Sequence, residues 1–446
     1  MRPSTHCWER GPRNVESQLA QDWIEEVWTL ARASGMDPAE TDFALVPGET
    51  LWAMASYGWP HAPAHWTFGR DYWRIRRQNM TGVSRLVELV VPGDPCLAYI
   101  DEASPLADQK LVVCHVAGHV DLFRRHPLFQ ESLRDMPRTF WSAAERASTY
   151  ADEHGAEAVE GVMDAALSLQ AQVGEPPADA ARDDASPDFR DLFIPKTPGP
   201  ARERPSRWAL PTADVLGFIA AHAPLLEPWE RDLCEVVRLA GLARRATRLT
   251  KIVHEGYASW AHHHLLDAMP LSGQERIVSA RSRALIGWES PAMVNPYDLG
   301  YRLFRFMEEQ EGAPAVVASA PTLTDGEFLG RWLTEESVDA LQLYRYHWVD
   351  AGRHWRATRD GGDWRAVRDE LVDAMVEEPP HVAVEAVEPD YTLVLRWDDP
   401  APPDEPWAKL TLDATARLWG GGVRLERERG PALIADKPVV TRRAHV

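Results

Sequence analysis

The sequence has 446 residues, of which 48 are Lys or Arg and 68 are Asp or Glu, so its formal net charge is −20. At about 150 residues per domain, this length predicts two or three domains and a large buried core. The acidic balance argues against a nucleic acid or an anionic membrane as partner, because the protein's own field would repel their phosphates.

Nothing in the sequence predicts export or a membrane span. The first residues carry charges on both sides of one Trp with no apolar run behind it, so we expect no signal peptide. No stretch approaches the roughly 18 continuous apolar residues that a span requires. Cys7, Cys96, Cys114 and Cys234 lie far apart, which is typical of free thiols in a reducing cytoplasm. We therefore expect a cytoplasmic protein.

Helical periodicity dominates the first 172 residues. In residues 15–35 the apolar side chains recur three and four apart, which places them on one helical face, and Gly35 fits a C-cap. The further helix-like segments are 70–90, 106–124 and 141–172, with a short apolar run at 96–100 between the first two. The last helix is interrupted only near Gly155.

The composition changes twice after residue 172. Pro, Asp, Arg and Ala dominate residues 173–207, which predicts a linker or an extended excursion. Helical patterns then resume at 212–222, 228–247, 250–269 and 295–310. From about residue 378, apolar and polar residues alternate as they do in half-buried strands.

We therefore predict a mainly α fold, with a multi-helix body and a small C-terminal α+β domain. The predicted divisions are an N-terminal helical part (1–172), the Pro-rich and charge-rich excursion (173–207), a second helical part (208–325) and the α+β domain (326–446).

The sharpest chemical signal is His115-Val116-Ala117-Gly118-His119. Two histidines four apart project from the same face of a helix, close enough to chelate one divalent ion. Asp121 could ligate the ion or orient a histidine. In the familiar metalloprotease signature a Glu base follows the first His, but here that residue is Val116, so the base must come from elsewhere. The alternative is a pair of core histidines satisfied by hydrogen bonds.

A second signal lies in residues 250–264, where Glu255 and His262 share a helix face about 10 Å apart along the axis. We predict that Glu255 is a metal ligand or the missing general base, with His262 a second ligand or proton donor. His254 is a further neighbour. The alternative places these histidines on an exposed helix face.

A third signal is a pair of carboxylates, Glu160 and Asp164, which are four residues apart. They repel each other unless a cation or proton lies between them, so we predict both as metal ligands, against the alternative of a solvated helix face. His65, Trp66 and Arg70 form a compact cluster that is typical of a pocket wall.

These motifs resemble those of the SpoVR (stage V sporulation protein R) family. Residues 65–70 look like its His-Trp-x-Phe-Gly-Lys element, and residues 115–123 like His-Val-x-Gly-His-x-Asp-Phe-Phe. Residues 155–164 echo Gly-x-x-x-Val-Glu-x-x-x-Asp, and residues 255–262 are similar to Glu-Gly-Trp-Ala-Ser-x-x-His. The turn at 295–300 matches Asn-Pro-Tyr-x-Leu-Gly, and the tail at 384–425 has the family's closing strand-and-helix pattern.

The chain also departs from the family pattern. His254 replaces the usual Asn, Tyr257 replaces a Trp, and the excursion at 173–207 stands where members carry an ordered segment with cysteines. We therefore expect a divergent member. The resemblance implies a cytoplasmic bacterial protein linked to sporulation or stationary-phase stress, with a serine-kinase-like ATPase and a von Willebrand-like protein as partners.

Two functions follow from the residues. The first is a metal-dependent hydrolase of amide-like substrates, in which His115, His119 and a carboxylate hold Zn, Fe or Mn and another carboxylate activates water. A variant with two bridged ions would suit oxidative chemistry with Fe or Mn. The second is a non-catalytic assembly or regulatory protein whose histidines and carboxylates form a structural polar network.

Overall fold

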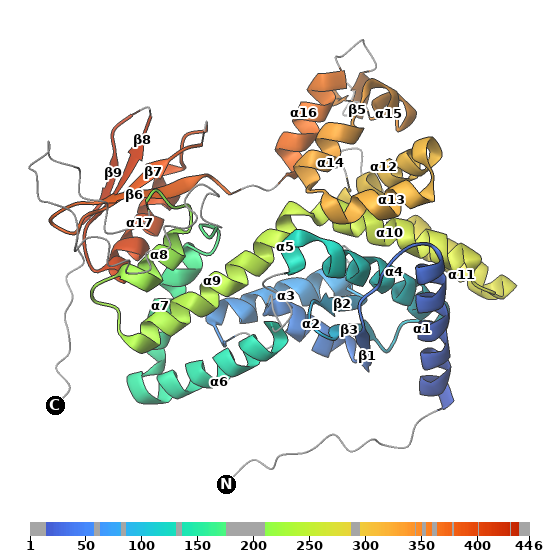
Figure 1. The fold of residues 1–446 in the computed structure, drawn as a ribbon, viewed down its shortest axis with the longest axis horizontal. Coiled ribbons are helices and arrows are strands. Elements are labelled where there is room, and N and C mark those ends of the chain that lie inside the picture. Colours follow the sequence, from blue (N-terminus) through green and yellow to red (C-terminus); the bar gives the residue numbers. More distant parts are fainter. Residues whose placement is uncertain are drawn as a thin grey trace, which may run out of the picture. The chain divides into compact units, whose positions relative to one another are not determined.

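The structure is a computed structural model. It describes residues 15–57, 63–81, 86–130, 136–174, 210–286, 295–343, 345–349, 354–358, 364–376, 379–399, 401–428 and 430–436. The chain is mainly α-helical with a strand-rich C-terminal part, which confirms the predicted fold class (Figure 1). The excursion predicted at 173–207 falls almost entirely outside the described residues.

The chain forms two compact units, and each is built from separate stretches of sequence. Unit 1 comprises residues 1–61, 66–139 and 246–377, and unit 2 comprises 62–65, 140–245 and 378–446. The boundaries predicted at 208 and 326 do not coincide with this division. Helices from the middle of the chain and strands from its end share one apolar core in unit 2, which sequence order alone does not indicate.

Unit 1 is a helical body with two small sheets. Its N-terminal elements are α1 (Val15–Ala33), β1 (Thr41–Val46), α2 (Gly48–Ser56), α3 (Trp66–Thr81), β2 (Glu88–Val91), β3 (Cys96–Asp101), α4 (Leu106–Arg125) and α5 (Pro127–Gln130). Its later elements are α10 (Lys251–Ala268), α11 (Gly273–Ile286), α12 (Pro296–Glu311), α13 (Ala313–Ser319), the 3-10 helix η3 (Ala320–Thr322), α14 (Asp325–Trp332), α15 (Glu335–Ala340), β4 (Arg345–Val349), β5 (His354–Thr358) and α16 (Trp364–Met375).

The first sheet of unit 1 has the order β1-β3-β2, with β1 parallel and β2 antiparallel to β3, while β4 and β5 form an antiparallel pair. The helix predicted over 70–90 ends earlier, because residues 88–91 pair with β3. The apolar run at 96–100 is the central strand β3. Gly35 follows α1 at φ +86°, the left-handed conformation that favours glycine, as the predicted C-cap requires.

Unit 2 combines helices with a four-stranded sheet. It contains most of α6 (Met136–His154) and α9 (Pro228–Leu249), together with α7 (Ala156–Ser168), α8 (Val215–His222), β6 (Val382–Val387), β7 (Leu393–Trp397), α17 (Glu405–Trp419), β8 (Val423–Arg427) and β9 (Leu433–Ala435). The strand order is β6-β7-β8-β9, and only β7 and β8 are parallel. Gly155, at φ +92°, makes the predicted break between α6 and α7.

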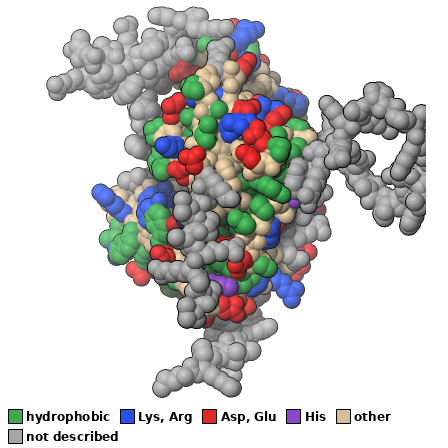
Figure 2. All heavy atoms as spheres, turned by 90° about the vertical axis from the view of Figure 1, so that its left-hand side faces the viewer, with side chains coloured by type: hydrophobic (Ala, Val, Ile, Leu, Met, Phe, Trp, Pro, Cys, Tyr) green, Lys and Arg blue, Asp and Glu red, His purple; other side chains and the backbone are tan. Residues whose placement is uncertain are grey.

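One face of the molecule is chemically mixed. On the face shown in Figure 2, acidic and basic side chains are interspersed rather than gathered into one patch. Among the helices of the described residues, none combines the length and apolar character needed to cross a bilayer.

Helix α4 lies at the centre of unit 1. Every residue from Lys110 to Phe123 is buried, so the helix is covered on all sides by other elements. Its main neighbour is α10, which in turn packs against α12. The two histidines predicted as ligands therefore lie in the core of the unit, and α10 supplies the residues that face them.

Candidate metal centre

Two glycine contacts bring the three helices unusually close together. A Cβ added to Gly118 of α4 would lie 2.7 Å from the Cα of Ala258 on α10, where no side chain fits. A Cβ on Gly256 of α10 would lie 2.5 Å from the carbonyl carbon of Gly300 on α12. Backbone can pack on backbone only where side chains are missing. These crossings set the distance between side chains on α4, α10 and α12.

His115 and His119, on either side of Gly118, point toward the same two carboxylates. The Nε2 atom of His115 lies 3.3 Å from Glu88 Oε1, at the start of β2, and 3.8 Å from Glu255 Oε2 on α10. The Nε2 atom of His119 lies 3.7 Å from the same Glu255 oxygen. The structure thus brings together three residues that the sequence singled out, and it adds Glu88.

His254 completes the group on the other side of Glu255. Its Nε2 atom lies 3.3 Å from Glu255 Oε1. Its Nδ1 atom lies 3.1 Å from the carbonyl oxygen of Thr250, one turn earlier on the chain. A carbonyl oxygen can only accept, so Nδ1 carries the proton and donates it. Nε2 is therefore the ring nitrogen that His254 turns toward the carboxylate, with Nδ1 held by a backbone carbonyl as in histidines that bind metals.

His262 lies behind His115 rather than beside Glu255. The Nδ1 atoms of the two histidines are 3.1 Å apart, so one donates to the other. When His115 is the donor, its Nε2 lone pair is free on the side of Glu88 and Glu255. His262, predicted as a ligand or proton donor, is thus placed to orient His115.

The distances test whether a divalent ion fits. Two ligands of a tetrahedral ion with bonds of about 2.1 Å stand about 3.4 Å apart. The four nitrogen–oxygen separations run from 3.3 to 3.8 Å, longer than ordinary hydrogen bonds. Moreover, His119 Nδ1 is buried with no hydrogen-bond partner among the described residues. These side chains therefore fit the shell of an ion better than a network of hydrogen bonds.

Two overlapping groups of possible ligands are present. Glu88, His115 and His119 form one, and His119, His254 and Glu255 form the other, with the ligand atoms of each group within 4.8 Å of one another. His119 belongs to both groups. The first group has the two-histidine, one-glutamate composition of many catalytic zinc sites.

Burial controls the protonation of the histidines. It lowers the pKa of His119 well below the usual value, with a further decrease from the nearby His115, so His119 is neutral. Burial acts in the same direction on His262 and holds its pKa well below the usual value. On His115 burial also lowers the pKa, but the charges of Glu88 and Glu255 outweigh it and the net shift is upward.

The carboxyls of Glu88 and Glu255 have pKa values shifted in opposite directions. Burial raises the pKa of Glu88, against the opposing charge of His115. Burial also acts to raise the pKa of Glu255, but the charge of His254 and the closeness of His115 outweigh it and hold that pKa well below its usual range. Glu255 is therefore ionised. A proton on His115 partly balances the carboxylates, and a divalent ion would take its place.

The other two predicted carboxylate ligands belong to unit 2. Glu160 and Asp164 are exposed residues of α7 in unit 2, and neither belongs to the two groups of possible ligands among the described residues. Asp164 Oδ1 lies 3.0 Å from Nε2 of His65, which also belongs to unit 2. As metal ligands Glu160 and Asp164 stay a prediction.

Asp121 and the predicted pocket wall are also placed by the structure. Asp121 is fully buried and accepts hydrogen bonds from Arg125 and from the Tyr257 hydroxyl at 2.7 Å, and so links α4 to α10. Trp66 and Arg70 lie on the exposed side of α3, where the guanidinium stands 5.6 Å from the centre of the indole ring. A role of these two residues in a pocket stays a prediction.

Sequence reasoning missed two members of the site. Glu88 lies in a short strand, and no spacing in the sequence links it to the histidines. The second is Tyr297 of α12, where the charge of Glu255, followed by burial, raises the pKa of the phenol well above its usual value. The sequence could have pointed to Tyr297, because this residue belongs to the Asn-Pro-Tyr motif at 295–300 that the chain shares with the family.

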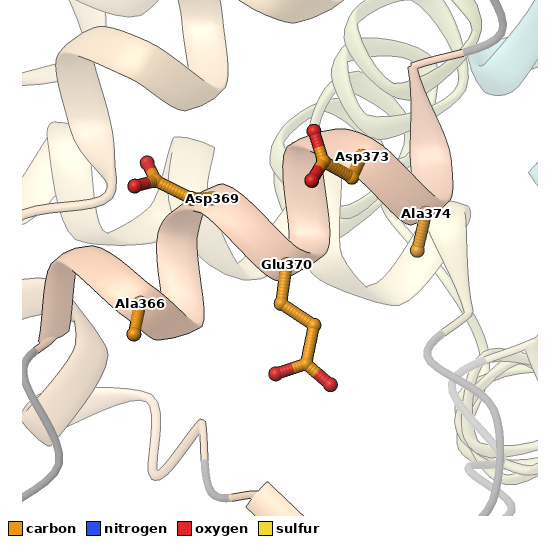
Figure 3. A pocket seen from close by; sticks show the side chains of 5 residues that line it. All are labelled: Ala366, Asp369, Glu370, Asp373 and Ala374. Carbon is orange, nitrogen blue, oxygen red and sulfur yellow. The ribbon is translucent and has the colours of Figure 1, made fainter. Parts of the chain in front are cut away.

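A surface hollow elsewhere in unit 1 has a different character. It is lined by Ala366, Asp369, Glu370, Asp373 and Ala374, all from α16. Its three carboxylates do not point toward one another (Figure 3). None of these residues belongs to the histidine group.

The fold and site define a helical protein with a buried group of histidines and carboxylates suited to a divalent ion. The family model for SpoVR like protein matches residues 14–378, and the chain belongs to the SpoVR family. The chain is similar to the uncharacterized protein YcgB of Escherichia coli (strain K12), with 24% identity over 476 aligned residues covering 92% of each chain. No solved structure matches the chain.

Proposed function

We propose that this protein is a metal-dependent hydrolase of amide-like substrates. The observation that carries the proposal is that Glu88, His115 and His119 lie close enough to be ligands of one ion, with Glu255 beside both histidines. Glu88, His115 and His119 would hold the ion. Once bound, Zn, Fe or Mn would polarise the substrate carbonyl and make water a better nucleophile.

Glu255 is the general base in this proposal. It is ionised, and its Oε2 atom faces both histidines at nearly equal distance. It would take a proton from water as the water oxygen attacks the carbonyl carbon. When the carbon–nitrogen bond breaks, the same proton would pass to the leaving amine. His254 holds the other carboxylate oxygen in place.

Two glutamate variants test these roles on the full chain, purified without a histidine tag and loaded with zinc. Glu255→Gln should keep the metal but lose at least about 100-fold in the hydrolysis of a peptide library read by mass spectrometry. Glu88→Gln should lose the metal itself. If loaded wild-type protein cleaves no member of the library, the hydrolase proposal is wrong.

One observation favours a second candidate, an oxidative enzyme with two Fe or Mn ions. The two oxygens of Glu255 face different histidines, Oε2 toward His115 and His119 and Oε1 toward His254, as a bridging carboxylate does. Metal counting separates the candidates. Two equivalents in wild-type protein, with one lost in Glu255→Gln, would favour the second.

The cellular setting is a proposal that family membership supports. We infer that the protein acts in the cytoplasm during sporulation or stationary-phase stress, with a kinase-like ATPase and a von Willebrand-like protein as partners. Cys96, Cys114 and Cys234 are free thiols, as a reducing compartment favours. Fractionated cells in stationary phase should hold the protein in the cytoplasmic fraction together with the ATPase. Recovery in the membrane pellet without it would contradict this setting.

A further inference from the structure

Helix α3 is covered on one side only. It packs on α2 through a half-buried face on which Phe68, Tyr72 and Ile75 recur four and three residues apart. The ring of Phe68 lies 4.7 Å from that of Tyr57, which follows α2 directly. No residue of α3 is fully buried. The opposite face of the helix is therefore left to solvent.

That opposite face carries large apolar side chains and arginines. Trp66, Trp73 and Met80 recur seven residues apart and are 55%, 62% and 66% exposed. Arg70 and Arg77 are also exposed and follow each tryptophan by four residues. At 3.6 residues per turn, these five residues form one stripe along α3. No other described helix exposes three large apolar side chains.

The charge of α3 is opposite in sign to that of the whole chain. Four arginines against one aspartate give α3 a net charge of +3, whereas the chain carries −20. The arginines also stack on the exposed indoles. The guanidinium of Arg76 stands 5.0 Å from the centre of the Trp73 ring, and that of Arg70 stands 5.6 Å from that of Trp66. Stacked in this way, they give a surface that is both apolar and cationic.

This composition is typical of a protein interface. Trp, Met and Arg are enriched where proteins bind one another and Lys is depleted, and α3 has no Lys. The cationic stripe favours a partner with carboxylates, which a guanidinium binds through paired hydrogen bonds. RNA or an anionic membrane would extend beyond α3 and meet the −20 charge of the chain. A short acidic helix would meet mainly the local charge, because salt screens charges beyond about 8 Å.

We propose that the exposed face of α3 is a docking surface for an acidic amphipathic helix of a partner protein. Apolar residues of that helix would lie on Trp73 and Met80, and its carboxylates would pair with arginines such as Arg77. The inference is independent of the proposed hydrolase function, because no residue of α3 belongs to the two groups of possible metal ligands.

The test uses the full chain and a fluorescein-labelled helical peptide, 16 residues long like α3, in which a stripe of Leu is flanked by Glu. Fluorescence anisotropy at low salt should show binding. Trp73→Ala and Arg77→Glu should each weaken it about tenfold, because the first removes a large apolar contact and the second reverses a paired charge. Both side chains are exposed, so both variants should unfold in urea as the wild type does.

Ile277→Ala is the matched control. Ile277 is 73% exposed on α11, so its loss should change the affinity for the peptide less than twofold. If the peptide does not bind the wild type, or binds all three variants alike, the inference is wrong. Phosphatidylglycerol vesicles and a single-stranded RNA are tested under the same conditions. If either binds through Trp73 and Arg77 more tightly than the peptide does, the face serves a membrane or RNA and the inference is overturned.

Discussion

Glu255 on α10 and Asp164 on α7 are both carboxylates on helices with many apolar residues, yet their surroundings differ. Glu255 lies among three histidines from two helices, and its side chain is 16% exposed. Asp164 pairs with His65, and its side chain is 51% exposed. The difference follows from how closely the neighbouring helices approach.

Glycines account for that approach. Gly256 and Gly118 each face the backbone of another helix, so side chains of different elements meet around Glu255. On α7, a Cβ added to Gly161 would instead meet the guanidinium of Arg417 at 2.2 Å, the end of a flexible side chain. The close backbone contacts at Gly118 and Gly256 thus bring histidines of α4 within reach of Glu255 on α10. Gly161 of α7 meets a side chain instead of another backbone.

The largest effect expected is that of filling such a contact. Gly256→Ala should lower the free energy of unfolding by at least about 3 kcal/mol, because the new methyl group overlaps the backbone of α12. Urea unfolding of the metal-free protein measures it. Gly273→Ala is the control, since its added Cβ meets nothing within 4 Å, and it should change stability by less than about 0.5 kcal/mol. If Gly256→Ala and Gly273→Ala lowered the free energy of unfolding equally, the close contact at Gly256 would not explain how α10 and α12 pack.

The next prediction sets the two histidine–carboxylate regions against each other. His119→Ala should weaken zinc binding at least about 100-fold, because His119 is common to both groups of possible ligands. His65→Ala removes a similarly buried histidine paired with a carboxylate and should leave zinc affinity unchanged. Competition with a chromogenic chelator measures both. A loss in His65→Ala alone would favour the other region as the metal site.

Local features of the fold and the site could be predicted from the sequence, whereas contacts between distant parts of the chain could not. Most helices around the site followed from periodicity, and the spacing of His115 and His119 predicted their shared face. Glu88 could not be found, because its link to the histidines exists only once β2 pairs with β3 beside α4. The sequence also did not predict that helices from the middle of the chain and strands from its end form one unit. Packing partners that are far apart in sequence leave no local pattern.

Helix α4 offers a third prediction, which concerns acid stability without any metal. Lys110 Nζ lies 2.6 Å from Glu275 Oε1 on α11, and this hydrogen bond, with others from Ser272, lowers the pKa of Glu275 to about 2 from a usual 4.5. The resulting stability is present above pH 4.5 and is lost as the pH falls toward 2.

Glu275→Gln should therefore cost about 1–2 kcal/mol at pH 7, and the difference from wild type should shrink as the pH falls through this range. Urea unfolding at several pH values provides the measurement. A difference that grows on acidification would show that Glu275 is not stabilised as a carboxylate.

The smallest effect is expected on α7. Asp164→Asn should change the free energy of unfolding by at most about 1 kcal/mol, because a half-exposed ion pair contributes little. The same unfolding assay applies. A loss above about 2 kcal/mol would show that the His65 pair supports unit 2 as strongly as a buried network does.

The most direct test of the central claim is the metal content of the wild-type full chain, purified without a tag and without added metal, by elemental analysis. The convergence of His115, His119 and the two glutamates predicts about one equivalent of Zn, Fe or Mn, which a chelator removes and the same ion restores. A protein that contains none of these ions and takes up none on titration would contradict the account.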